Sequence, residues 1–314
     1  MMRKSEKNFM SDNKKNRNWS IYSILFLISF GIVFSCNQTE NVKSIFEKEN
    51  LVAWCIVPFD SKNRSPDERA MMLNELGITS IAWDWRSKHL PLFEYEIEIL
   101  RKSNIELKSV WFYVNASSEN VIDNECEMIL QSLEKTKTQT DLWVSFPESF
   151  FEGLSEEEKI KKGASTIGYI NNRARKMNCT ISLYNHGGWF GTPENMVKII
   201  KAMNSTEIGL VYNFHHAHSQ STNFEKNINL MLPYLTTVNL NGMRKNGPKI
   251  LPLGDGNMEL EMMKTLKDSG FSGSIGILGH KDDEDVKISL QKNLDGMKKL
   301  LEQMGDESTL KSYN

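Results

Sequence analysis

Residues 179–215 read CTISLYNHGGWFGTPENMVKIIKAMNSTEIGLVYNFH and contain one complete unit of the fold. The runs 179–186 and 207–215 are short and rich in β-branched and aromatic residues, which is typical of buried strands. Between them, Thr192-Pro193-Glu194 has the composition of a helix start, because proline fits the first turn and an acidic side chain is favourable there. A strand, a helix and a second strand in this order predict a βα unit of a parallel sheet.

The same alternation of strand and helix continues along the chain from Leu51. We predict eight strands, at residues 51–59, 78–86, 105–114, 141–147, 179–186, 207–215, 236–241 and 273–280. Eight units in about 255 residues match the length of a closed (β/α)8 barrel. An open doubly wound sheet is the alternative, but its first turn is normally rich in glycine, and Pro58-Phe59-Asp60-Ser61 is not. The sequence therefore predicts an α/β fold, a single TIM barrel over residues 51–305 with a tail at 306–314.

Local signals support helices between these strands. Ser65-Pro66-Asp67-Glu68 places a capping serine before a proline and two acids, and Gly77 follows as the residue that ends the helix. We therefore predict a helix over Ser65–Leu76. The segment Leu253-Gly254-Asp255-Gly256-Asn257 resembles a weak phosphate-binding turn, and capping of a helix is the expected role.

The composition excludes several classes of protein. Hydrophobic residues make up 39% and charged residues 25% of the chain, which are ordinary globular values. The formal net charge is -2, so we expect no large basic surface and no nucleic-acid partner. Cys55, Cys126 and Cys179 are widely spaced and odd in number, which fits buried small residues better than a disulfide framework or a metal knuckle.

The N-terminal segment has the layout of a signal peptide. Residues before Trp19 carry six basic and two acidic side chains, and Ile21 to Ser35 is a run of fifteen uncharged residues. This run is shorter than the ~20 residues that span a bilayer, and it resembles a bacterial lipoprotein signal with Cys36 as the lipid-modified first residue. We predict a signal peptide at 1–35 and a polar tether at 36–50. The mature protein would be lipid-anchored in the bacterial cell envelope, facing the periplasm; an uncleaved N-terminal anchor is the alternative.

The alternation of each strand predicts which side chains point into the barrel. In the fifth strand Ile181 and Leu183 should contact helices, which turns Ser182, Tyr184 and His186 inward. By the same alternation the inward positions near other strand ends are Asp84, Arg86, Val211, Asn213, His215, Asn239, Asn241 and His280.

All six histidines fall at or just beyond the end of a predicted strand. They are His89, His186, His215, His216, His218 and His280. The carboxyl ends of the strands are where such barrels place their chemistry, so we expect these imidazoles to converge around one opening. The glycines after His186 allow close approach of the backbone to a ligand, and Trp189 is a candidate to stack on a sugar face.

Several motifs are similar to those of the xylose-isomerase-like barrels, the sugar phosphate isomerases and epimerases. The resemblance covers about Leu51 to Leu301 and is carried by the runs Trp83-Asp84-Trp85-Arg86, Tyr184 to Gly191, Tyr212 to His218, Asn239 to Met243 and Gly276 to His280. It implies a divalent metal held by Glu, Asp, His and Glu from late strands. This chain departs from that set, because His186 and His280 occupy the expected glutamate positions and the seventh strand offers Asn239 and Asn241.

The departure leads to a specific hypothesis for the site. Neutral imidazoles suit Zn²⁺ or another divalent transition metal such as Mn²⁺, and we expect His186, His215 and His280 to be the ligands. A metal-free site in which these imidazoles form hydrogen bonds and transfer protons is the alternative. Asp84, Arg86 and His216 are the expected catalytic residues. The expected sugar-binding residues are His89, Trp189, Asn213, Asn239 and Asn241.

The resemblance implies proton abstraction next to a carbonyl group. An envelope location argues against a phosphorylated substrate, so we expect a sugar that is unphosphorylated or oxidised to a keto-sugar. Isomerisation or epimerisation is the expected reaction. The alternatives are a lyase or hydratase of 3-keto sugars on the same barrel, and a carbohydrate-binding lipoprotein without catalysis.

Overall fold

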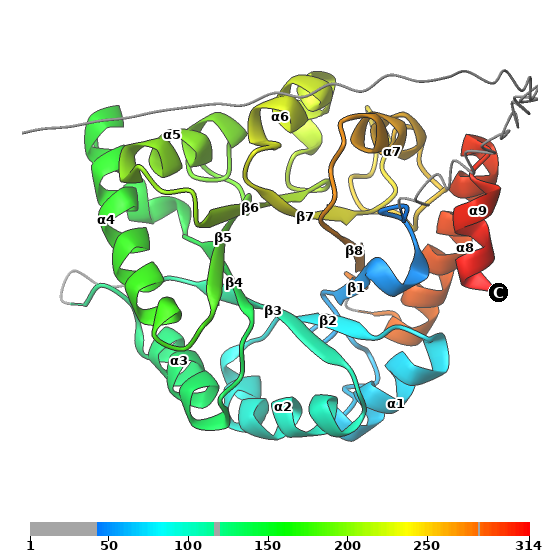
Figure 1. The fold of residues 1–314 in the computed structure, drawn as a ribbon, viewed down its shortest axis with the longest axis horizontal. Helices are drawn as coiled ribbons and strands as arrows, with labels where there is room; N and C mark the ends of the chain where they lie inside the picture. The colour runs from blue at the N-terminus through cyan, green and yellow to red at the C-terminus, as the bar shows by residue number, and fades with distance from the viewer. Residues whose placement is uncertain (1–42, 116–119, 282) are drawn as a thin grey trace, which may run out of the picture. The chain divides into compact units, whose positions relative to one another are not determined.

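The computed structural model describes residues 43–115, 120–281 and 283–314. Within these residues, eight parallel strands are hydrogen-bonded in chain order from β1 to β8, and β8 pairs with β1 to close the barrel. Helices surround the strands on the outside, as Figure 1 shows. The predicted (β/α)8 barrel is confirmed, and the open sheet that was its alternative is wrong.

The strands are β1 (Leu51–Trp54), β2 (Ser80–Trp83), β3 (Glu106–Tyr113), β4 (Asp141–Ser145), β5 (Thr180–Tyr184), β6 (Ile208–Asn213), β7 (Leu235–Leu240) and β8 (Ser274–Leu278). The α-helices are α1 (Pro66–Leu76), α2 (Phe93–Lys102), α3 (Asn124–Thr136), α4 (Glu156–Arg175), α5 (Pro193–Met203), α6 (Phe224–Met231), α7 (Glu259–Asp268), α8 (Val286–Met304) and α9 (Glu307–Leu310). The 3-10 helices are η1 (Lys48–Asn50), η2 (Ser87–Leu92), η3 (Glu148–Phe151), η4 (His218–Asn223) and η5 (Lys311–Tyr313).

The strands overlap their predicted ranges, and several end earlier than predicted. β5 ends at Tyr184, two residues before His186, and β8 ends at Leu278, two residues before His280. The chemically distinctive side chains therefore lie in the first residues of the loops. Such positions are anchored by the barrel and still reach the opening at its carboxyl end.

Helix α1 begins and ends where its sequence predicts. The Ser65 side chain accepts a hydrogen bond from the Glu68 amide, and the Glu68 side chain accepts one from the Ser65 amide, which forms a capping box. Gly77 then adopts a left-handed conformation with φ of 66° and ends the helix.

Apolar side chains form two separate cores. The larger one lies between the strands and the helices and contains Ile181 and Leu183. The smaller one fills the inside of the barrel and includes Trp54, Trp143 and Tyr184. The predicted alternation of inward and outward residues in β5 is therefore confirmed.

Buried carboxylates hold the loops at the carboxyl end of the barrel. Asp60 accepts hydrogen bonds from the Arg64 guanidinium and from the Val286 amide, which joins the loop after β1 to the start of α8. Glu259 accepts bonds from the amides of Gly254 and Gly256. The glycine-containing segment 253–257 thus binds a carboxylate of its own chain, in agreement with a capping role rather than a phosphate site.

The ends of the described domain pack together. Phe46 is buried, its carbonyl accepts a hydrogen bond from the Tyr313 hydroxyl, and the Lys48 amide donates to the Ser312 hydroxyl. The predicted signal peptide, Cys36 and the rest of the predicted tether up to residue 42 lie outside the described residues. In the part of the chain that the structure describes, no helix has the length and apolar character required to cross a membrane.

Candidate active site

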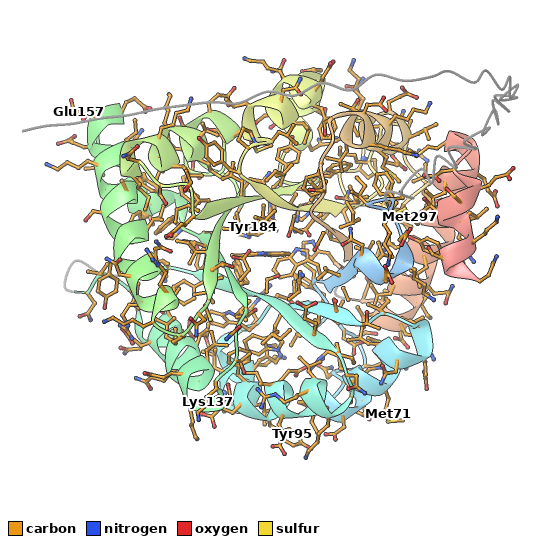
Figure 2. The ribbon with its side chains drawn as sticks, viewed as in Figure 1. Met71, Tyr95, Lys137, Glu157, Tyr184 and Met297 are labelled. Atoms are coloured by element: carbon orange, nitrogen blue, oxygen red, sulfur yellow. The ribbon has the colours of Figure 1, made fainter. Side chains whose placement is uncertain are left out.

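A cavity of ≈ 120 Å³ lies at the carboxyl end of the barrel. Its lining residues are Trp54, Cys55, Phe59, Asp84, Arg86, Trp111, Tyr184, His186, His215, His216 and His280. Tyr184, labelled in Figure 2, lies on the inner side of the barrel at the end of β5. Six residues with a predicted role therefore line one cavity. They are the expected metal ligands His186, His215 and His280 and the expected catalytic residues Asp84, Arg86 and His216.

Four imidazole rings stand close together in this cavity. The ring centroids of His215 and His216 are 3.9 Å apart, and those of His186 and His216 are 4.6 Å apart. His280, from the loop after β8, completes the group with its ring centroid 5.4 Å from that of His215. The loops after β5, β6 and β8 thus bring these histidines together.

Three of these imidazoles, those of His186, His215 and His216, are neutral at pH 7. Burial lowers the pKa of His186 to about 4 and that of His216 to about 3. Burial and the neighbouring His216 hold the pKa of His215 well below its usual value. A neutral imidazole presents one N–H donor and one nitrogen acceptor, so each ring can bind a metal or exchange a hydrogen bond with a ligand.

Asp84 follows β2 and is the cavity's carboxylate. Its Oδ1 accepts a hydrogen bond of 3.3 Å from the Val57 amide, and its Oδ2 is buried without a hydrogen-bond partner among the described residues. Burial raises the pKa of Asp84 to about 7. A carboxyl group that changes protonation state near neutral pH is suited to accept and return protons.

The hydroxyl of Tyr184 is oriented by Asn213. The Asn213 Oδ1 accepts a hydrogen bond from the His215 amide, which directs its Nδ2 toward the Tyr184 hydroxyl at 2.8 Å. The Asn185 side chain fixes this arrangement, because it both accepts from the Asn213 amide and donates to the Asn213 carbonyl. An amide NH₂ only donates, so the phenol oxygen accepts here and its own proton is available to a ligand.

Arg86 lies at the exposed rim of the cavity. Its guanidinium carbon is 5.1 Å from the ring centroid of Phe59 and 5.8 Å from that of Trp111. Its Nη1 donates a hydrogen bond of 2.7 Å to the Trp85 carbonyl. The aromatic rings support the guanidinium while much of it stays open to solvent.

Two expected sugar-binding residues do not line the cavity. The Nδ1 of His89 accepts a hydrogen bond of 2.9 Å from the Arg86 amide, which fixes the ring in the turn after β2. The indole of Trp189 donates to Glu156 at the start of α4 and packs on Phe151, with ring centroids 5.0 Å apart. Trp189 is therefore directed toward α4 instead of the cavity.

The three expected asparagines point inward but lie outside the cavity lining. Asn213 is fully buried in the network described above, and Asn241 donates to the carbonyls of Gly242 and Lys249 in the loop after β7. Asn239 is fully buried, and both polar atoms of its side chain lack a hydrogen-bond partner among the described residues. An ideal Cβ at Gly276 would be 1.8 Å from the Asn239 Oδ1, so β8 passes directly over this amide.

The expectation that all six histidines converge is wrong for two of them. His89 is held as described above, and a ring nitrogen of His218 lies 2.8 Å from the Arg244 carbonyl. His89 lies in η2 and His218 begins η4, and in these 3-10 helices the alternation of a strand no longer fixes the direction of a side chain.

The cavity also includes aromatic residues that sequence reasoning did not assign to the site. Phe59 contacts His280 edge to face, with ring centroids 3.9 Å apart, and Trp111 lies 5.3 Å from the His186 ring. The alternation in β3 contains a signal for Trp111, because its neighbours Val110 and Phe112 belong to the outer core. Phe59 follows β1 in a loop and has no comparable signal.

A preformed metal centre is not evident in the described residues. No group of three or more His, Cys, Asp or Glu side chains within them is arranged to hold a metal ion. The Nδ1 of His215 is nevertheless buried with no hydrogen-bond partner in the same part of the chain. The site thus offers donor atoms of the kind that a transition metal prefers without grouping three of them around one point.

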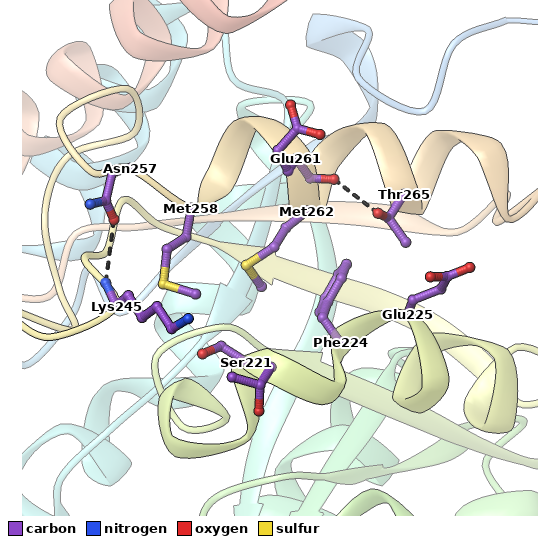
Figure 3. A pocket seen from close by; sticks show the side chains of 10 residues that line it. Ser221, Phe224, Glu225, Lys245, Asn257, Met258, Glu261, Met262 and Thr265 are labelled. Atoms are coloured by element: carbon purple, nitrogen blue, oxygen red, sulfur yellow. Dashed lines mark hydrogen bonds between the residues drawn. The ribbon is translucent and has the colours of Figure 1, made fainter.

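A second and larger cavity of ≈ 410 Å³ lies between α6 and α7, as Figure 3 shows. It is lined by Ser221, Thr222, Phe224, Glu225, Lys245, Asn257, Met258, Glu261, Met262 and Thr265. Lys245 and Thr265 form local hydrogen bonds there, to Asn257 and to the Glu261 carbonyl. None of the predicted site residues lines this cavity, so its larger size does not make it the better candidate for the active site.

The molecule is a closed eight-stranded TIM barrel with titratable groups at the carboxyl ends of its strands. Enzymes with this fold place their active sites at that end. Residues 72–303 match the family described as xylose isomerase-like TIM barrel. The chain belongs to this family. No curated protein matches the sequence significantly.

Solved structures with the same fold have low sequence identity to this chain. The 3-keto-D-glucoside 4-epimerase from E. coli has a TM-score of 0.61 at 13% identity, over 80% of this chain and all 100% of that one. The IolI protein with a binding zinc atom has a TM-score of 0.59 at 14% identity, over 80% and 98% of the two chains. The probable 3-DHS dehydratase from Bacillus anthracis has a TM-score of 0.58 at 14% identity, over 77% and 97%. These similarities establish the fold.

Proposed function

We propose that the protein is a sugar isomerase or epimerase that removes and returns a proton at a carbon next to a carbonyl group. The observation that carries the proposal is the pairing, in one cavity, of a buried Asp84 with a pKa of about 7 and a Tyr184 hydroxyl whose proton is available to a ligand. The similarity to a 3-keto-D-glucoside 4-epimerase supports this class of reaction.

Asp84 is the proton acceptor in this proposal. In its ionised form the Oδ2 atom, which has no partner among the described residues, takes the proton from the carbon next to the carbonyl. The electron pair of the broken C–H bond moves toward the carbonyl and leaves negative charge on its oxygen. The Tyr184 O–H donates a hydrogen bond to that oxygen, which stabilises the enediolate in a site with little water.

The return of the proton decides the product. Delivery to the opposite face of the same carbon gives an epimer, and delivery to the neighbouring carbon gives an isomer. The neutral His216, close to His186 and His215, is placed to relay protons between oxygen atoms of the substrate. If Asp84 instead returned its proton to a hydroxyl group on the next carbon, that group would leave as water and the reaction would be an elimination. The similarity to a probable dehydratase supports this as a second reaction.

A divalent transition metal bound by His186, His215 and His280 belongs to the proposal as a cofactor. The donor chemistry fits, because the imidazoles of His186 and His215 are neutral at pH 7 and the buried Nδ1 of His215 has no partner within the described chain. A zinc atom bound to a protein of the same fold supports it. When bound, the metal would polarise the substrate carbonyl. The steps above use only side chains, since the described residues form no preformed three-ligand group.

We further propose that the enzyme acts in the cell envelope, anchored through a lipid on Cys36. The support is the basic and then uncharged composition of residues 1–35. Labelling cells with a radioactive or alkyne-tagged fatty acid tests the anchor, with Cys36→Ser as the control that should lose the label. A C36S protein that keeps the label contradicts it.

The reaction is tested by incubating the protein with keto-sugars and aldoses in D₂O and following deuterium at the carbon next to the carbonyl by NMR. We expect incorporation by the wild type and its loss in Asp84→Asn. Asp141→Asn is the matched control, because Asp141 begins β4 at the opposite end of the barrel and also has a pKa raised by burial, to about 6. Binding of a sugar without any incorporation would instead identify a carbohydrate-binding protein.

A further inference from the structure

The cavity wall carries little negative charge. Among its lining residues Asp84 is the one carboxylate and no side chain is an amide. Asn213 and Asn241 lie outside the lining, with their amide groups bonded to protein atoms.

Arg86 adds a charged donor to this wall. Arg86 forms no salt bridge to any carboxylate among the described residues, and its Nη1 bond to the Trp85 carbonyl uses one of five N–H donors. A planar guanidinium held against Phe59 and Trp111 is thus available to a ligand at the rim.

Two cations lie near the imidazole group. Arg86 acts electrostatically on His186, and Lys249 acts on His215 and His216. These cations outnumber the one carboxylate of the lining, Asp84, which favours an anionic ligand.

We propose that the natural substrate is an acid sugar, an oxidised sugar that bears a carboxylate, and that Arg86 binds this carboxylate at the rim. The inference rests on the proposed function and names the substrate class of the same site. The guanidinium fork binds a carboxylate through two parallel N–H···O bonds, and the aromatic rings fix its plane. The cavity of ≈ 120 Å³ is below the ~300 to 1,000 Å³ of drug-sized ligand sites, which suits a single sugar ring.

Matched pairs of sugars test this inference directly. Glucose and glucuronate, galactose and galacturonate, and mannose and mannuronate differ only in the group at carbon 6. Binding of each to the wild-type protein is measured by saturation-transfer NMR and calorimetry. We expect each uronate to bind at least about 10-fold more tightly than its neutral partner, because charge-assisted bidentate bonds are about twice as strong as neutral ones. The preference should decrease with added salt.

Two variants assign the preference to Arg86. Arg86→Gln should remove the preference for uronates and leave the weak binding of neutral sugars, whereas Arg86→Lys should keep part of it. Lys88→Gln is the matched control, since Lys88 is an exposed cation two residues away that does not line the cavity. Equal binding of both members of each pair by the wild type, or an unchanged preference in Arg86→Gln, would overturn the inference.

The outcome separates this inference from the proposed reaction. Uronates that bind through Arg86 but take up no deuterium contradict the proton transfer and leave the acid-sugar inference standing. Neutral sugars that take up deuterium when their uronates do not contradict the inference and leave the proton transfer standing.

Discussion

Asn213 donates a hydrogen bond from Nδ2 to the Tyr184 hydroxyl at 2.8 Å, and this bond decides where the phenol proton points. The orientation of the amide is itself fixed, because its Oδ1 accepts from the His215 amide. A side chain at the end of β6 thus prepares a donor at the end of β5 for the substrate.

Replacement of Tyr184 by phenylalanine tests the use of this proton. We expect Tyr184→Phe to reduce the rate of deuterium exchange by about 10²- to 10³-fold, the usual loss when one donor to an oxyanion is removed. Sugar binding should change little. Tyr212→Phe is the control, since Tyr212 lies on the next strand and packs in the outer core. Equal rates for the two variants would contradict the role of Tyr184.

The rate should depend on pH through Asp84. Its pKa is raised to about 7, mainly by burial, so the ionised form that accepts a proton accumulates as the pH rises. The exchange rate should therefore increase up to about pH 7 and then level off. The measurement is the initial rate of deuterium uptake between pH 5 and 9. A rate that falls over this range would assign the proton transfer to a group that must be protonated.

The stability of the fold should depend on the same carboxyl group. The pKa of Asp84 is higher in the folded state, about 7, than the ordinary value of 3.8 that applies when the chain unfolds. The folded protein therefore holds a proton that the unfolded chain has lost between these two pH values, and stability decreases as the pH rises through this window. The change is on the order of 1.4 kcal/mol per pH unit at most.

Denaturant unfolding of the wild type and Asp84→Asn measures this effect. The amide does not ionise, so the variant should gain stability over the wild type from pH 4 to pH 7, and the gain should become constant above about pH 7. A difference between the two proteins that does not change with pH would contradict a raised pKa for Asp84.

The packing around two helical glycines predicts opposite effects of an alanine substitution on stability. An ideal Cβ at Gly296 in α8 would be 1.8 Å from the Leu253 carbonyl oxygen, whereas nothing lies within 4 Å of one at Gly168 in α4. We expect Gly296→Ala to lower the free energy of unfolding by about 1 to 3 kcal/mol. Gly168→Ala should raise it by about 0.5 to 1 kcal/mol, because alanine loses less backbone entropy in a helix. Thermal melts of the two variants check the contrast.

Metal content checks the proposed ligands independently of activity. We expect the purified protein to contain close to one Zn²⁺ or Mn²⁺ per chain by elemental analysis, and the triple variant with glutamine at His186, His215 and His280 to contain none. Retention of the metal by this variant would contradict the assignment of ligands. Absence of metal from a wild-type protein that exchanges deuterium would favour the metal-free site.

The fold was predictable because local signals agree along the chain. Ser65 and Gly77 mark the ends of α1, and the outward Ile181 and Leu183 fix the face of β5. Comparable signals recur elsewhere, such as the capping box of Ser155 at the start of α4 and Gly305 at the end of α8. The same consistency between local preference and global fold is what makes a sequence fold to one structure.

The site was predictable only where strand alternation extends to the functional residue. His186, His215 and His280 follow their strands by two residues and line the cavity as expected. Trp189 lies further along its loop, where contacts with Glu156 and Phe151 set its direction. Such contacts join segments far apart in sequence, which a single strand pattern does not encode.

The alternation of inward and outward residues in a strand also does not reveal how deep along the barrel axis a side chain lies. Asn213 and His215 share the inward face of β6 and its extension, yet Asn213 is bonded inside the protein and His215 reaches the cavity. Depth follows from how strands are staggered around the closed sheet. The supporting role of Asn213, and with it the orientation of Tyr184, could therefore be seen only in the structure.

The most direct test of the proton transfer is turnover of a substrate that carries deuterium at the carbon next to its carbonyl group. We predict that the wild type transfers this deuterium to solvent as product forms, more slowly than it transfers protium, and that Asp84→Asn does not. Product that forms at the wild-type rate with all of its deuterium still on that carbon would contradict the proposed chemistry.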